Sequence, residues 1–205
     1  LPALGAEIDR IAATLSNAEY AGTRFFNRAF AAELQRDYAA AAEHLGAAIS
    51  SNPNVGPGAH SWRGRMLVRD GRLAGARAEL EAVGATSDRG KRIDMERTYL
   101  EAVLAAAERS PEAPGLFADV IKQAREMELV QTVLLAQYDF ASLVGLQDPA
   151  ARAAAEEALE ATRRNAWNGI GGLLEPLFAE GAEVPASPAA LETTGDVVRA
   201  GGNPS

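Results

Sequence analysis

The sequence predicts an all-helical protein, and three observations lead to that class. Apolar residues recur at helical spacing along almost the whole chain. No segment alternates apolar and polar residues with β-branched enrichment, which is the pattern of a strand. Hydrophobic residues make up 47% of the 205 residues but aromatic ones only 6%, so alanine supplies much of the apolar content. Alanine favours helix and lets neighbouring helices approach closely.

Short segments rich in turn-forming residues separate the expected helices. Four such breaks are SNPNVGPG (51–58), RDGR (69–72), SPEAPG (110–115) and LQDP (146–149). The expected helices span 3–16, 22–35, 38–51, 58–69, 73–84, 90–109, 112–126, 128–144, 148–165 and 168–179. Between Glu126 and Leu129 there is no glycine or proline, so two helices or one long bent helix would both fit.

Two segments near the carboxyl end receive separate interpretations. NGIGG (168–172) follows no strand and lacks the lysine of a nucleotide-binding loop, so we interpret it as a flexible joint. Residues 181–205 form a tail that we expect to be partly flexible. Ser187 followed by Pro188 favours a short helix near 188–199, since serine caps a helix and proline suits its first turn.

Composition excludes several classes of partner. A net charge of −8 argues against direct nucleic-acid contact and against an anionic membrane surface. No apolar run approaches the roughly 18–20 residues that span a bilayer, so we expect no membrane insertion. The absence of cysteine excludes a disulfide or a thiolate metal site. It leaves the compartment open, with the cytoplasm slightly favoured over the periplasm.

We find no catalytic constellation and therefore expect no enzyme, cofactor or metal. The two histidines, His44 and His60, have no partner at ligand or triad spacing, and a zinc site needs three or four ligands. Carboxylates such as Glu79 and Glu81 are expected to lie on solvated helix faces. Glu160 and Arg164 are expected to form an i, i+4 ion pair on such a face.

Basic residues hint at the source of the chain. Only Lys91 and Lys122 of the 20 basic residues are lysine, which together with the alanine and glycine content suggests a high-GC bacterium. The first residue is not methionine, so we interpret the chain as a processed protein or a piece of a longer one.

The chain also repeats itself. A shift of 35 residues places Tyr38 on Leu73, Ala41 on Ala76, Leu45 on Leu80, Ala48 on Val83, Ala29 on Gly64 and Ala32 on Leu67. Two helices approach closely only where both carry small side chains, because a helix with its side chains is about 10 Å across. Ala29 with Ala41, and Gly64 with Ala76, are the expected crossing points.

This pattern resembles the tetratricopeptide repeat, a 34-residue helix–turn–helix unit. The residues of 22–55 that carry the resemblance are Phe25, Ala29, Asp37, Tyr38, Ala41, Leu45, Ala48 and Pro53. A looser copy over 57–90 carries Gly64, Leu67, Gly71, Leu73, Ala76 and Leu80. The resemblance is clear over 22–90, and helix pairs continue in degenerate form over 91–166.

The resemblance implies a right-handed α-solenoid, in which each helix hairpin buries its apolar face against its neighbours. Residues 1–180 would form the array, with a capping helix at 1–17 and a second cap at 167–180. The first helices of successive repeats would line a concave groove. Family geometry places Phe26, Phe30, Glu33, Arg65 and Arg69 on that groove, and we add Tyr99 and Tyr138 as partner-binding candidates.

The expected function is non-catalytic binding of a protein or peptide segment. The phenylalanines would bury a hydrophobic anchor, and the arginines would bind a carboxylate by forked contacts. The chain would serve as the interaction or regulatory module of a larger bacterial signalling or assembly protein. Two alternatives stay open: a homo-oligomerisation module, with a homodimer possible, and a small-molecule sensor whose pocket is lined by Tyr99, Gln131 and Tyr138.

Overall fold

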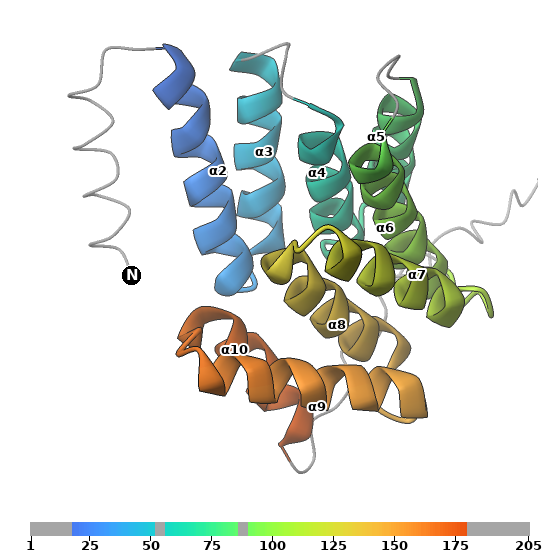
Figure 1. Ribbon diagram of the computed structural model, residues 1–205. Helices are drawn as coiled ribbons and strands as arrows, with labels where there is room; N and C mark the ends of the chain where they lie inside the picture. Colours follow the sequence, from blue (N-terminus) through green and yellow to red (C-terminus); the bar gives the residue numbers. More distant parts are fainter. Residues whose placement is uncertain (1–17, 52–55, 86–89, 180–205) are drawn as a thin grey trace, which may run out of the picture.

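The computed structural model describes residues 18–51, 56–85 and 90–179, and these ranges fold into helices without any strand (Figure 1). The predicted all-α class is therefore confirmed. The elements are α2 (Ala18–Leu34), α3 (Tyr38–Ser51), α4 (Pro57–Arg69), α5 (Leu73–Ala85), α6 (Lys91–Ala107), α7 (Ala113–Glu126), α8 (Val130–Val144), α9 (Pro149–Arg164), α10 (Asn168–Leu174) and the 3₁₀ turn η1 (Glu175–Phe178). The helix expected at 3–16 and the tail at 181–205 lie outside the described residues.

Helix starts follow local sequence signals. The carboxylate of Asp148 accepts hydrogen bonds from the backbone N–H groups of Ala150 and Ala151, each at 2.9 Å, and Pro149 occupies the first turn of α9. This is the capping arrangement that aspartate and proline favour. The break predicted at LQDP is therefore a capped helix start.

Five helices end with the same backbone turn. A residue with positive φ follows each of them: Arg36 (60°), Gly71 (81°), Arg109 (57°), Glu128 (58°) and Ala166 (53°). The next backbone N–H then bonds back to a carbonyl in the last helical turn, as from Leu129 to Ala124 at 2.9 Å. This geometry reverses the chain tightly and satisfies carbonyls that the helix end leaves open. At Glu128 it separates α7 from α8, so the junction holds two helices and not one bent helix.

The segment NGIGG lies at the start of the helix expected over 168–179, and we also interpret it from its sequence as a flexible joint. It is helical and forms most of α10, so the flexible-joint interpretation is wrong. Ile170 and Gly171 are buried within it. A Cβ on Gly171 would lie 3.4 Å from the Thr162 hydroxyl of α9, so the glycines permit a close approach to that helix. Tertiary packing overrides the poor helix propensity of glycine here.

Successive helices pack in pairs, α2 with α3, α4 with α5, α6 with α7 and α8 with α9, and α4 also packs on α6 and α6 on α8. Small residues occupy the interiors of these pairs, and Ala29, Ala41 and Ala76 are fully buried. Gly64 is also buried, but its nearest neighbour is Leu100 of α6: an added Cβ would lie 2.5 Å from a Leu100 methyl. Gly64 therefore also sets the spacing between α4 and α6.

The two ends of the described chain meet. Figure 1 shows α10 below the lower end of α2, and these two helices are in contact. Phe30 and Leu34 of α2 pack against the apolar cluster of α8 to α10, whose buried members include Ile170 and Leu173. The Arg36 guanidinium donates a hydrogen bond to the backbone carbonyl of Leu173 at 3.0 Å. The carboxyl-terminal helices thus cover one end of the first hairpin.

Candidate functional site

The two predicted aromatic anchors pack against a tryptophan. Phe26 stacks on Trp62 of α4 with ring centroids 6.1 Å apart, and Phe30 meets the same ring edge-on at 6.4 Å. All three side chains are half-buried. The aromatic side chains of α2 are therefore largely engaged with α4, although part of each ring remains accessible.

The two predicted arginines are buried and share one internal carboxylate. Arg65 and Arg69 each bring a guanidinium nitrogen to Asp139 of α8, Arg65 at 3.4 Å and Arg69 at closer range. Arg69 also donates to the Ser142 hydroxyl at 2.6 Å. Each arginine side chain is less than a tenth exposed. The carboxylate contact expected from a partner is thus made by the chain itself.

The two predicted tyrosines complete this network. The Tyr99 hydroxyl donates to Asp139 at 2.7 Å, and the Arg65 guanidinium lies 4.1 Å from the centre of the Tyr99 ring. Arg69 lies 4.7 Å from the centre of the Tyr138 ring, whose hydroxyl is 3.0 Å from that of Tyr38. Cation–π contacts of this kind strengthen when the groups are removed from water.

Glu33 brings a second acidic group to the network. It is 2% exposed and accepts a hydrogen bond from the Trp62 indole at 2.9 Å. Burial raises the pKa of the Glu33 carboxyl above its ordinary value of 4.5, and Arg65 opposes this shift only in part. Burial alone would lower the pKa of Arg69, but Asp139 and the two tyrosines raise it above its ordinary value. Arg69 therefore stays protonated.

Five of the predicted site residues are thus brought together in the interior, whereas Phe26 and Phe30 stay half-buried beside Trp62. We name the group formed by Glu33, Arg65, Arg69, Tyr99, Tyr138 and Asp139 the buried charge network. It contains two acidic and two basic groups, and it joins α2, α4, α6 and α8. Sequence reasoning missed Asp139. The sequence did contain a sign of its role, because Gln137 and Asp139 are polar residues within the otherwise apolar run LLAQYDF, where a polar side chain is expected to be buried.

A second buried ion pair corrects the interpretation of Glu79 as a solvated carboxylate. Glu79 is 6% exposed, and its two oxygens contact His60 Nδ1 at 2.7 Å and the Arg63 guanidinium. These contacts tie α5 to α4. The i, i+4 ion pair predicted between Glu160 and Arg164 is present at 3.5 Å on the exposed face of α9.

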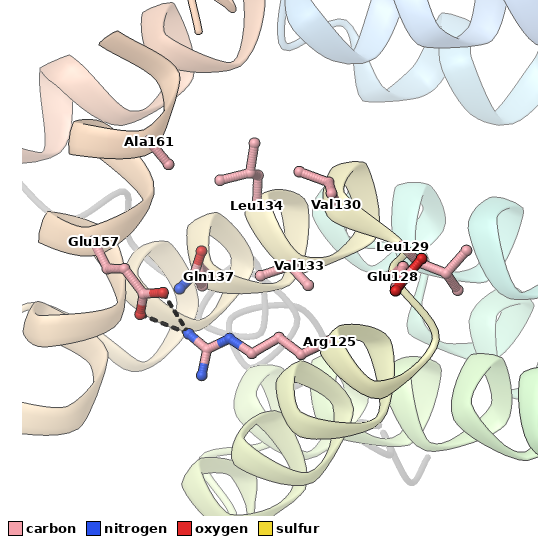
Figure 2. A pocket seen from close by; sticks show the side chains of 9 residues that line it. All are labelled: Arg125, Glu128, Leu129, Val130, Val133, Leu134, Gln137, Glu157 and Ala161. Atoms are coloured by element: carbon pink, nitrogen blue, oxygen red, sulfur yellow. Dashed lines mark hydrogen bonds and ion pairs between the residues drawn. The ribbon is translucent and has the colours of Figure 1, made fainter. Parts of the chain in front are cut away.

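A hollow opens between α7, α8 and α9, and its lining includes none of the predicted groove residues (Figure 2). Its volume is about 590 Å³, and we call it the α7–α9 hollow. Ligand pockets commonly measure about 300–1,000 Å³. Its lining is Arg125, Glu128, Leu129, Val130, Val133, Leu134, Gln137, Glu157 and Ala161.

Exposed apolar surface and an unsatisfied amide distinguish this hollow. Val130 is 53% exposed. The other large apolar side chain that is exposed among the described residues is Trp167, at 38%. Gln137 is 1% exposed, and its Nε2 has no hydrogen-bond partner. Figure 2 shows the ion pair between Arg125 and Glu157 across the same hollow, with Arg125 Nη2 at 2.6 Å from both carboxylate oxygens.

The small-molecule pocket suggested by Tyr99, Gln131 and Tyr138 does not take that form. The two tyrosines are buried in the charge network, whereas Gln131 is exposed on α8.

Within the described ranges no three or more His, Cys, Asp or Glu side chains are placed to hold a metal ion. None of the described helices combines the length and the apolar character needed to cross a membrane.

Comparisons of the chain with family models, curated proteins and solved structures find no match. The likeness to tetratricopeptide repeats therefore remains a prediction from the residues quoted above.

Proposed function

We propose that this chain is a non-catalytic protein-interaction module, built as an α-solenoid of hairpins like tetratricopeptide repeats, within a larger bacterial signalling or assembly protein. Helix pairs with a common closing turn, and contacts from α4 to α6 and from α6 to α8, support that architecture. Such arrays stack hairpins and present extended surfaces to partners.

The observation that carries the binding function is the α7–α9 hollow. It combines an apolar lining, the exposed Val130 and a buried amide without a partner. The groove predicted from Arg65 and Arg69 is a weaker candidate, because its polar groups already bind one another. We therefore place the partner-binding surface on α7, α8 and α9.

A display library of random heptapeptides, selected on the immobilised full chain, tests this function. We expect peptides to be enriched on the wild type and lost on Val130→Asp. Aspartate suits the first residue of a helix, where it interacts favourably with the helix dipole, so this variant should fold. Gln131→Asp is the matched control, since it adds the same charge at the adjacent exposed position outside the hollow. Failure to enrich any peptide would contradict the proposal.

A further inference from the structure

Resting on the interaction function proposed above, we infer that the α7–α9 hollow binds an extended peptide segment that carries an aliphatic side chain next to a basic residue. The Gln137 carboxamide would hydrogen-bond the backbone of that segment. Three features of the lining identify this ligand: its hydrogen-bonding capacity, its apolar surface and its charge.

The hydrogen-bonding requirement comes from Gln137. A buried amide N–H without a partner costs about 1–3 kcal/mol, so such groups in folded proteins are normally satisfied. Gln137 lines a hollow that is open to solvent, but its Nε2 is itself buried, so an incoming acceptor reaches this donor when the side chain turns toward the hollow. A carboxamide offers both a donor and an acceptor, which is the complement of one peptide group. Extended peptides bind through main-chain hydrogen bonds of this kind.

The apolar requirement comes from the rest of the lining. Five of the lining residues are aliphatic: Leu129, Val130, Val133, Leu134 and Ala161. They lie along α8 and on the facing side of α9. Removing apolar surface from water contributes roughly 25 cal/mol per Å², so a branched aliphatic side chain gains most from this surface.

The charge requirement comes from the rim. Glu128 and Glu157 outnumber Arg125, and Arg125 is already held by Glu157. The whole chain carries a net charge of −8. A ligand carboxylate would meet this acidic balance, whereas a lysine or arginine beside the aliphatic residue complements Glu128. An acidic rim therefore favours a partner with a basic residue and disfavours a partner with an acidic one.

The test uses the heptapeptides selected on the full chain. We expect them to share an aliphatic residue adjacent to lysine or arginine, and to lose about tenfold in affinity on Gln137→Leu, the loss typical of one hydrogen bond. Leucine replaces an unsatisfied amide with an apolar group of similar size, so the free energy of unfolding should be unchanged or higher. If Gln137→Leu destabilises the protein instead, the amide has an internal partner and the inference fails.

A charge swap tests the basic residue separately. Replacing that residue of a selected peptide with glutamate should weaken binding to the wild type, and Glu128→Lys should reverse the preference. This inference is overturned if the selected peptides lack the aliphatic and basic pair, or if Gln137→Leu does not weaken their binding. In either case the proposed function still stands. Absence of any selected peptide would overturn both. Self-association in sedimentation that Val130→Asp abolishes would make a second copy the occupant, and would likewise overturn the peptide assignment.

Discussion

Asp139 holds the two buried arginines of this protein, and at the residue scale it determines what the predicted groove can do. Arg65, Arg69 and Tyr99 all donate hydrogen bonds to its carboxylate. Asp139 as a whole residue is only 2% exposed. Forked arginine–carboxylate contacts were the chemistry expected of a bound partner. Because the chain supplies this carboxylate from α8, the arginines are structural in the described fold.

Asp139→Asn should therefore destabilise the fold strongly. Asparagine keeps the size of the side chain but removes the carboxylate charge that Arg65 and Arg69 share in a buried site, and the loss of one partner of a buried ion pair typically costs about 3–5 kcal/mol. Denaturant unfolding of the two proteins measures the difference. Glu108→Gln is the control, because it breaks an exposed ion pair with Arg77, worth about 0–1 kcal/mol. Equal losses in both variants would show that the buried charge network is not structural.

Glu33 should make stability depend on pH in a direction unusual for a carboxylate. Its pKa is raised by burial, so the folded protein binds this proton more tightly than the unfolded chain does. The stabilisation is complete below pH 4.5 and is lost as the pH rises through the raised pKa. We expect the free energy of unfolding of the wild type to fall across that range relative to Glu33→Gln. Parallel pH profiles of the two proteins would contradict this assignment.

At the scale of the elements, the recurring feature is the turn that closes five of the helices. Only one of its five positive-φ positions, Gly71, is glycine, whereas arginine, glutamate or alanine occupies the others. A side chain in the left-handed region costs about 1–2 kcal/mol, because its Cβ approaches the following carbonyl. The fold sustains this strain because the turn places each helix against the next.

Arg109→Gly should relieve that strain between α6 and α7. Arg109 has a φ of 57° and is exposed, so we expect the free energy of unfolding to rise by about 1 kcal/mol. Arg109→Ala removes the same side chain but keeps a Cβ, and it should leave stability nearly unchanged. Thermal unfolding of the three proteins separates the two effects. If alanine stabilises as much as glycine does, backbone strain is not the cause.

At the scale of the whole molecule, close helix spacing and closure of the two ends shape the protein. Gly64 lets α4 lie against Leu100 of α6, and Gly169 faces Leu34 across the contact between α10 and α2. The buried charge network joins helices that are far apart in the chain, as Arg69 of α4 and Asp139 of α8 show. The described helices are thus held together by packing within the pairs and by polar contacts across them.

Gly64→Ala should force α4 and α6 apart. The new Cβ would lie 2.5 Å from a Leu100 methyl and 3.2 Å from its Cγ, and because Leu100 is fully buried, it can move aside only by displacing its own neighbours. Overpacking of this kind typically costs about 1–3 kcal/mol. Gly115→Ala is the control, since nothing lies within 4 Å of its added Cβ and alanine favours helix. Combining Gly64→Ala with Leu100→Ala should cost less than the sum of the two, and additive costs would refute the steric explanation.

The sequence by itself determined the helical class and almost every helix boundary among the described residues. It could do so because these are set by local forces: the spacing of apolar residues, caps such as Asp148, and turn formers such as those of RDGR. It also named candidate side chains of α2, α4, α6 and α8 that lie together in the fold, those of α2 and α4 from the resemblance to tetratricopeptide repeats.

Only the tertiary structure decided what those side chains do. Asp139 reaches Arg69 across 70 positions of the chain, and no local pattern encodes that pairing. The same holds for Glu79, which helical periodicity placed on a solvated face although it is 6% exposed. The α7–α9 hollow likewise depends on how three helices are spaced and on one amide, that of Gln137, being left without a partner. Such features arise from long-range geometry, which side-chain spacing along one helix does not specify.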